Sequence, residues 1–144
     1  MEKDRDIFLE GLTKIINLTQ KGNIVWSAAD ASDIVCKPPE DKIKIAFKTY
    51  YLGKGLRIYE RTYKEIVNPP SAFTPISVYV FEQRKPGEYW YSEIVLETLD
   101  DSGRPVFQFP RTIMLKDLFF AVQYQVSGIK EYLDKILSEN EDDK

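Results

Sequence analysis

Histidine is absent from the 144 residues of this chain, and cysteine occurs once, at Cys36. Without histidine the chain lacks the commonest general base and the commonest metal ligand, which disfavours most hydrolytic and metal-centred chemistry. A single cysteine cannot form an internal disulfide, so the cross-linked framework of small secreted domains is excluded. No apolar run reaches the roughly 18 residues of a membrane helix, and the charged N-terminus does not lead into a signal peptide. We therefore expect a soluble, cytoplasmic protein that does not bind membranes.

The composition is that of an ordinary globular protein, with 43% hydrophobic and 30% charged residues. The length suits one domain with its own core. The net charge of −3 is unevenly distributed, because seven basic residues and one acid lie between Lys42 and Lys64, whereas residues 138–144 carry four acids. We predict a single domain over residues 1–137 and a flexible acidic tail over residues 138–144.

Two helices are predicted, one towards each end of the chain. Apolar residues recur at helical spacing from about residue 4 to residue 19, and Gly22 suits the left-handed position that follows a helix end. A longer apolar stripe runs over residues 114–137 and is expected to bend at Ser127-Gly128.

The two strands that flank Gly53 can be placed in register by requiring each face of the sheet to be chemically uniform. A two-residue turn at Gly53-Lys54 would place Tyr50 opposite Arg57 and Lys48 opposite Tyr59. A three-residue turn would mix the two faces and is rejected. The apolar face then holds Ile43, Ile45, Phe47, Thr49, Tyr51, Leu56 and Ile58. The opposite face is basic and rich in tyrosine.

The remaining strands follow from loops expected at residues 85–88 and 100–103, and from a short strand at residues 24–26. The expected pairs on the apolar face are Tyr79–Ile94, Phe81–Ser92, Gln83–Trp90, Leu96–Phe107 and Ile94–Phe109. Trp26 and Trp90 are therefore both expected to be buried. Residues 27–41 and the proline-rich residues 68–75 are predicted to be loops. The sequence predicts an α+β fold in which an antiparallel β-meander of about five strands carries the N-terminal and C-terminal helices on one face.

The order of these parts resembles that of small uncharacterised bacterial and mobile-element α+β domains. The resemblance is carried by the Gly-x-Ile-x-Trp step at residues 22–26 and by the segment SGIKEYL at residues 127–133. It spans most of the chain and implies a prokaryotic or phage origin. Such domains lend no established catalytic residues to this sequence.

The best functional candidate is the basic, tyrosine-rich side of the sheet, which we call the basic face. Its members are Lys44, Lys48, Tyr50, Arg57, Tyr59, Arg61 and Tyr63. Aromatic rings and cations on a flat sheet can bind single-stranded nucleic acid or an acidic protein surface. The same residues are also explained as an ordinary wet sheet face, on which basic side chains cover tyrosine rings as cross-strand cation–π pairs.

Catalytic alternatives have less support. Glu93 and Glu97 alternate on one strand beside Glu82, and such carboxylates could act as acid and base or hold Mg²⁺ through water, although solubilising acids look the same. Cys36 has no histidine to activate it. Gly53-Lys54-Gly55 is explained as a hairpin turn and is too short for a phosphate-binding loop. The sequence therefore argues against an enzyme, and we expect neither a metal ion nor a cofactor.

Our functional hypothesis is a small non-enzymatic interaction module of unknown pathway. It would bind a protein partner through the basic face or through the C-terminal helix, whose long apolar stripe also suits self-association into a homo-oligomer or simple burial in the core. The alternatives are a binder of nucleic acid or another anionic ligand on the basic face, and a metal-dependent enzyme that uses the outer glutamates.

Overall fold

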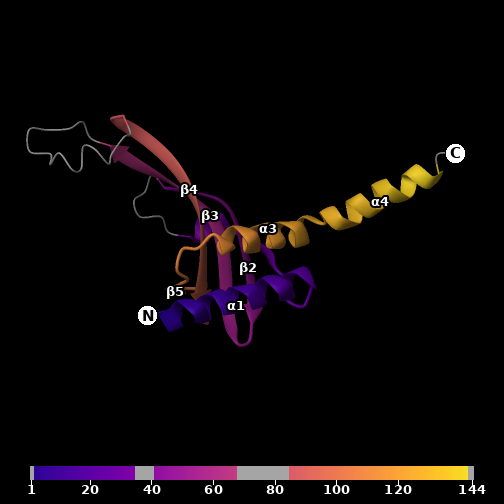
Figure 1. Cartoon of the computed structure of the whole chain (residues 1–144), viewed down its shortest axis with the longest axis horizontal. Helices are drawn as coiled ribbons and strands as arrows, with labels where there is room; N and C mark the ends of the chain where they lie inside the picture. Colours follow the sequence, from indigo (N-terminus) through magenta and orange to yellow (C-terminus); the bar gives the residue numbers. More distant parts are fainter. Residues whose placement is uncertain (1, 35–40, 68–84, 143–144) are drawn as a thin grey trace, which may run out of the picture.

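The computed structural model describes residues 2–34, 41–67 and 85–142 and confirms the α+β class (Figure 1). In chain order the elements are α1 (Glu2–Gln20), β1 (Ser27–Ala29), the 3-10 helix η1 (Ala31–Asp33), β2 (Lys42–Tyr51), β3 (Lys54–Val67), β4 (Gly87–Leu99), β5 (Pro105–Gln108), α3 (Met114–Ser127) and α4 (Ile129–Asp142). The strands form one five-stranded antiparallel sheet in the order β1-β2-β3-β4-β5. The described sheet is an antiparallel meander, as expected, but β4 pairs with β3, whereas the sequence had paired residues 90–94 with residues 79–83.

The centre of the sheet is the long pairing of β3 with β4. It runs without interruption from Gly55 opposite Leu99 to Val67 opposite Gly87. The pairs expected for residues 79–83 lie outside the described residues. Within the described part, the neighbours of β4 are β3 and β5.

The β2–β3 hairpin differs from the expected register by two residues. Its turn is Leu52-Gly53, with positive φ angles of 50° and 79°, which is the backbone geometry that a tight hairpin requires. Lys48 consequently lies opposite Arg57. Because side chains alternate with a period of two along a strand, a shift of two residues leaves every side chain on its expected face.

The β4–β5 connection shows the same shift of two residues. Thr98 lies opposite Phe107, and the Phe109 N–H donates to the Leu96 carbonyl at 2.8 Å. The expected role of Asp100 in turn formation is confirmed, because its Oδ1 accepts from the Ser102 hydroxyl at 2.7 Å and from backbone N–H groups of the loop. The hydrogen bond from the Ser102 side chain is the main reason that the pKa of Asp100 is lowered.

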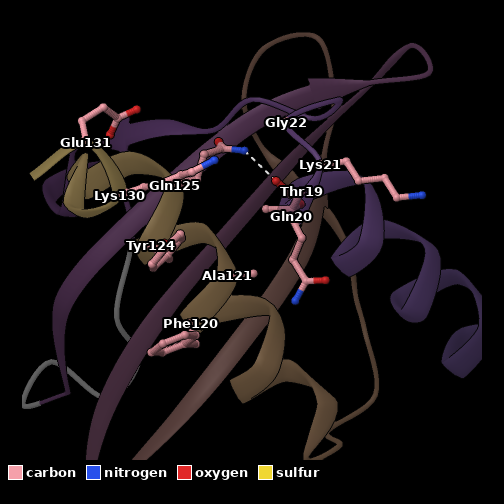
Figure 2. Close-up of a pocket in the computed structure, with 10 residues that line it drawn as sticks. All are labelled: Thr19, Gln20, Lys21, Gly22, Phe120, Ala121, Tyr124, Gln125, Lys130 and Glu131. Carbon is pink, nitrogen blue, oxygen red and sulfur yellow. Dashed lines mark hydrogen bonds between the residues drawn. The ribbon is translucent and has the colours of Figure 1, made fainter. Parts of the chain in front are cut away.

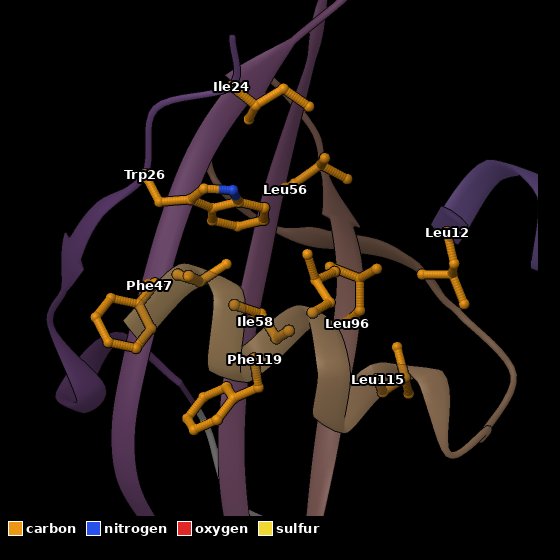
Figure 3. Close-up of a cluster of buried hydrophobic side chains, with 11 residues drawn as sticks. Leu12, Ile24, Trp26, Phe47, Leu56, Ile58, Leu96, Leu115 and Phe119 are labelled. Atoms are coloured by element: carbon orange, nitrogen blue, oxygen red, sulfur yellow. The ribbon is translucent and has the colours of Figure 1, made fainter. Parts of the chain in front are cut away.

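The hydrophobic core lies between the sheet and the helices α1 and α3, on the side that we call the helix face (Figures 1 and 3). The largest fully buried side chains are Leu12, Thr19, Ile58, Leu96, Leu115, Leu118 and Val122. Phe47 of β2 meets Phe119 of α3 edge to face, with ring centroids 5.9 Å apart. Each fully buried aliphatic or aromatic side chain contributes roughly 1.5–3 kcal/mol, so this layer stabilises the fold.

Trp26 is buried as predicted, but the strand near it begins later than expected. The short strand is Ser27–Ala29 and not residues 24–26. The backbone before it bonds instead to the side chain of Gln125, which accepts from the Trp26 N–H and donates to the Ile24 carbonyl, both at 2.7 Å. The Trp26 indole N–H also donates to the Thr19 hydroxyl at 3.0 Å. These bonds tie the end of α1 to α3.

The expectation that Trp90 is buried is wrong, since 49% of its surface is exposed. Trp90 lies opposite Lys64 towards the far end of the β3–β4 pair. That end extends beyond the helices in Figure 1. The helix face, on which Trp90 was expected, therefore has no layer of helices above it there. The Lys42 ammonium lies 5.7 Å from the centroid of the indole.

The C-terminal helix is broken where a bend was expected. Gly128 adopts φ 69° in the left-handed region and separates α3 from α4. Helix α3 lies on the sheet, whereas α4 extends away from the body of the protein (Figure 1). Residues 138–142, expected to belong to a flexible tail, are the last turns of α4. No helix of the described chain is long and apolar enough to cross a membrane.

Candidate functional site

The second face of the sheet, opposite the helix face, is partly covered by the segment that follows β1. Ile34, just after η1, forms a small buried cluster with Ala46, Tyr59 and Val95. The register of β2 shifts between Ile43 and Ile45, so Ile43 leaves the expected apolar face and packs against this cluster instead. The face that was expected to be wet therefore has a core of its own.

The structure consequently separates the residues of the basic face. Lys44, Lys48 and Tyr50 are exposed, whereas Arg57 and Tyr59 retain only 6% and 8% of their surface. Arg61 and Tyr63 are half-buried. The expectation that these side chains share the same face is confirmed for β2 and β3 near the turn, but the expectation that all are accessible together is wrong.

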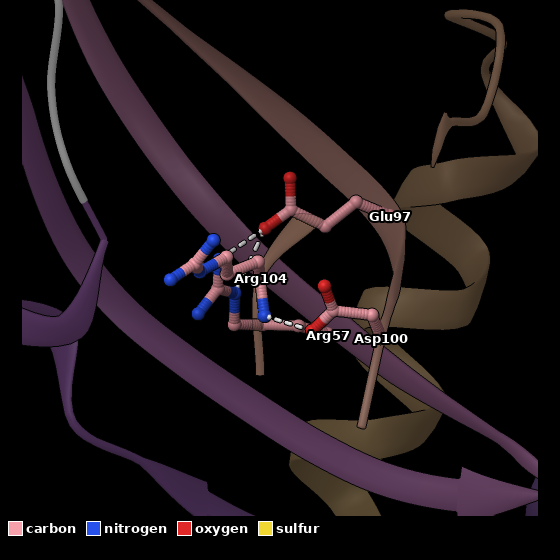
Figure 4. A network of polar contacts seen from close by, with 4 residues as sticks. All are labelled: Arg57, Glu97, Asp100 and Arg104. Carbon is pink, nitrogen blue, oxygen red and sulfur yellow. Dashed lines mark hydrogen bonds and ion pairs between the residues drawn. The ribbon is translucent and has the colours of Figure 1, made fainter. Parts of the chain in front are cut away.

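Arg57 is held by a buried ion pair with Glu97 on the neighbouring strand (Figure 4). The Arg57 Nε and Nη2 donate to the same carboxylate oxygen, Glu97 Oε1, at 2.8 and 2.6 Å. Each side chain is only 7% exposed. A pair this well shielded from water is far more sensitive to loss of one partner than a surface pair is.

Arg61 continues the same arrangement along the sheet. Its Nη2 lies 2.5 Å from Glu93 Oε1, its Nη1 lies 3.4 Å from Asp41 Oδ2, and Arg111 pairs with the other oxygen of Glu93. We call this set, together with Arg57–Glu97, the ion-pair ladder. Three arginines and three carboxylates give it a formal charge of zero. The arginines of the basic face and the outer glutamates were separate candidates in the sequence, and the structure makes them partners.

The non-functional explanation of the basic face expected cation–π pairs between neighbouring strands, but the contact seen at Tyr63 is made within β3. The guanidinium carbon of Arg61 lies 5.1 Å from the centroid of the Tyr63 ring. Tyr63 in turn lies beside Tyr91 on β4, with centroids 5.8 Å apart. Arg61 is thus used structurally on two sides, by carboxylates and by an aromatic ring.

The carboxylates offer little to a metal ion. In the ranges 2–34, 41–67 and 85–142, no three His, Cys, Asp or Glu side chains are arranged to hold one. Glu93 and Glu97 already face arginine guanidinium groups, which place fixed positive charge where a cation would have to bind. Glu82 and Cys36 lie outside the described residues.

An apolar stripe on α4 is open to solvent. Tyr132, Leu133, Ile136 and Leu137 are 61%, 42%, 40% and 66% exposed. At 100° per residue these positions fall on one side of the helix with Ile129, whereas Ser138 lies on the opposite side. A stripe of this kind normally faces a core, and here it faces solvent.

A hollow of about 430 Å³ lies where α4 leaves the body (Figure 2). It is bounded by the end of α1, by the outer side of α3 and by Lys130 in the first turn of α4. Phe120 and Tyr124 form its aromatic wall, with stacked rings 6.4 Å apart and exposures of 69% and 41%. Lys21, Lys130 and Glu131 also line it, so its charged side chains carry a net charge of +1.

Sequence reasoning missed this aromatic wall, although a signal was present. Phe119 and Phe120 are adjacent on a helix, so only one of the two can face the core. Tyr124 follows Phe120 by four residues and must lie on the same outer side. The adjacent phenylalanines therefore indicated an exposed aromatic surface. We missed it because we interpreted the apolar residues from 114 to 137 as one continuous stripe.

Comparison with known proteins assigns no function to this arrangement. No family model, curated protein or solved structure matches the chain. The resemblance to small bacterial and mobile-element domains, and the origin that it implies, therefore stay predictions from the residues.

Proposed function

We propose that this protein is a non-enzymatic interaction module that binds a protein partner through α4. The observation that carries the proposal is the exposure of the Tyr132, Leu133, Ile136 and Leu137 stripe on a helix that extends away from the body. Large contiguous apolar surface on a folded protein commonly marks an interaction site. Docking of an amphipathic helix into a groove or against another helix uses positions at this spacing.

The physical state of α4 supports the same proposal. An isolated helix of 14 residues is marginal in water, because packing of its apolar face normally supplies most of its stability. The last turn of α4 has no basic residue to complement the negative end of the helix dipole. A partner that covers the stripe would supply the missing stabilisation.

The basic face has less support as a binding surface. Of its four cations, Arg57 and Arg61 are neutralised within the ion-pair ladder, which leaves Lys44 and Lys48 as its exposed cations. Two lysines beside one exposed tyrosine form a weak platform for phosphates, whose binding strength grows with the number of charges neutralised. Anion or nucleic-acid binding on this face is therefore the second candidate.

The test compares two variants of the tagged full chain expressed in its source cell. Leu133→Glu adds one negative charge to the stripe, and Ser138→Glu adds the same charge on the opposite side of the same helix. We expect proteins recovered with the wild type to be lost with Leu133→Glu and retained with Ser138→Glu. Circular dichroism of the purified variants checks that both remain folded. Equal recovery with both variants would contradict binding through α4 and would redirect attention to Lys44 and Lys48.

A further inference from the structure

We infer that the partner of α4 is the α4 helix of a second copy of this chain, bound in an antiparallel orientation. The inference rests on the proposed function and specifies its partner. Two identical amphipathic helices related by a twofold axis bury the same stripe on each other, which is the commonest symmetry of soluble oligomers. The charges along α4 and the place from which it leaves the body select the orientation.

Charge is unevenly distributed along α4. The first half, residues 129–135, carries two lysines and two acids and is neutral, whereas the second half, residues 136–142, carries three acids and no base. Parallel pairing would place the two acidic halves side by side, which is repulsive. Antiparallel pairing places each acidic half beside the half that contains Lys130 and Lys135. It also brings the acidic C-terminal end near the positive end of the partner's helix dipole.

The surroundings of the first turn extend this complementarity. The acidic end of a second α4 would arrive where the hollow lies, whose charged residues Lys21, Lys130 and Glu131 leave one positive charge in excess, beside the rings of Phe120 and Tyr124. The stripe alone spans only about two turns, which is small against the roughly 1,200 Å² that a stable interface buries. The exposed aromatic wall enlarges the apolar surface at each end of the pair. Lys21 and Lys130 would lie near the acidic residues of the second α4.

Steric considerations favour the same orientation. Helix α4 projects from one end of the body (Figure 1), and its 14 residues span about 21 Å. Antiparallel pairing places the two sheets at opposite ends of the helix pair. Parallel pairing would bring both bodies to the same end of the helix pair.

The first experiment measures the mass of the purified full chain by analytical ultracentrifugation from about 1 µM to about 1 mM, a range that covers weak and moderate dimers. We expect a monomer–dimer equilibrium in the wild type and in Ser138→Glu. Leu133→Glu should raise the dissociation constant by about thirtyfold or more, as expected for loss of a central interface residue. A wild type that stays monomeric throughout would overturn the inference, as would a dimer that Leu133→Glu leaves unchanged.

The second experiment determines the orientation. A zero-length carbodiimide cross-linker joins lysines to carboxylates in contact, and mass spectrometry then identifies the linked peptides. Lys130 and Glu139 are nine residues apart, about 13.5 Å along one helix, so a link between them must join two chains. Mixing isotopically labelled with unlabelled protein verifies this. We expect links from Lys130 to the C-terminal peptide 136–144, and links from Lys130 only to Glu131 or Asp134 would overturn the antiparallel arrangement.

The outcomes separate this inference from the proposed function. A monomeric wild type that still recovers a different protein through Leu133 would refute self-association while preserving α4 as the binding element. A dimer that forms equally well with Leu133→Glu would place the self-contact elsewhere and refute this inference, whereas the proposed function fails only if Leu133→Glu and Ser138→Glu recover the same proteins.

Discussion

The buried pair between Arg57 and Glu97 allows the most decisive test of the tertiary structure. Arg57→Met removes the cation but keeps an apolar side chain of similar length, and it leaves the Glu97 carboxylate without its partner. Because both side chains are only 7% exposed, water cannot easily replace the lost guanidinium. We expect the variant to fold with much lower stability.

The magnitude follows from the two hydrogen bonds that Arg57 donates to Glu97 Oε1, at 2.8 and 2.6 Å. Hydrogen bonds to charged groups contribute about 1.5–3 kcal/mol each, and removing one member of a buried ion pair typically costs about 3–5 kcal/mol. Such a loss is a large fraction of the roughly 5–15 kcal/mol by which folded domains are stable. With an m-value of about 2 kcal/mol per molar urea, the unfolding midpoint should fall by about 2 M.

The assay is urea unfolding of the wild type, Arg57→Met, Glu97→Leu and the double variant, followed by far-ultraviolet circular dichroism. Each single change should be strongly destabilising. The double change should lie within about 1 kcal/mol of the wild type or above it, because an apolar pair carries no desolvation cost. The four values form a double-mutant cycle that isolates the pair.

Two results would refute this reasoning. Single changes that cost less than about 1 kcal/mol would mean that the pair behaves as an exposed one. A double variant as unstable as the sum of the singles would mean that side-chain volume, and not charge, is responsible. The same geometry predicts that Arg57→Glu is strongly destabilising, because it would place two carboxylates against each other in a buried site.

The remaining predictions concern the tryptophans, the β4–β5 loop and the helix break. Trp26→Ala should cost about 3–5 kcal/mol in urea unfolding and Trp90→Ala about 0.5 kcal/mol, because only Trp26 is buried; equal costs would show that the far end of the sheet is covered. Asp100→Asn should destabilise the protein at pH 7, and this loss should shrink as the pH is lowered: the folded pKa is lowered, so the charged form stabilises the fold above the ordinary pKa of about 3.9 and this contribution is lost as the pH falls through the folded pKa. A difference in unfolding midpoint between the wild type and Asp100→Asn that stays the same at low pH would contradict this prediction. Gly128→Ala should lower stability by about 1–2 kcal/mol in thermal melts, because φ 69° is strained for alanine. Asparagine tolerates that conformation better, so Gly128→Asn should lose less stability than Gly128→Ala. A similar loss of stability in both variants would mean that backbone strain is not the cause.

The faces of the strands could be read from local pattern even where the register was wrong. Both hairpins are shifted by two residues from the expected pairing, yet Phe47, Ile58 and Leu96 all lie in the predicted core. Alternation along a strand repeats every two residues, so the face of a side chain survives any even shift. The glycine at position 53 indicated a two-residue turn, but it did not distinguish a turn at Gly53-Lys54 from the observed turn at Leu52-Gly53.

The candidate site could not be read in the same way. Nothing in residues 27–41 indicated that Ile34 would cover the second face, and a covering segment changes the energy of every charge beneath it. Arg57 and Glu97 are 40 positions apart, and their pairing depends on β3 lying directly beside β4. The sequence therefore suggested an unpaired basic face and an unpaired row of glutamates. In the fold these residues form the ion-pair ladder, which has no net charge.

The sequence by itself determined the class of the fold, the two helical regions, the position near Gly128 at which the second one changes direction, and the side of the sheet on which each described strand residue near the β2–β3 turn lies. These follow from periodicity and from backbone preferences of single residues, which act over a few positions. Only the tertiary structure decided which surfaces stay open. Burial depends on whether a second layer extends over a given residue, as it does over Trp26 and does not over Trp90 or Leu133. That outcome is set by the lengths and directions of elements far apart in the chain, and local pattern does not carry it.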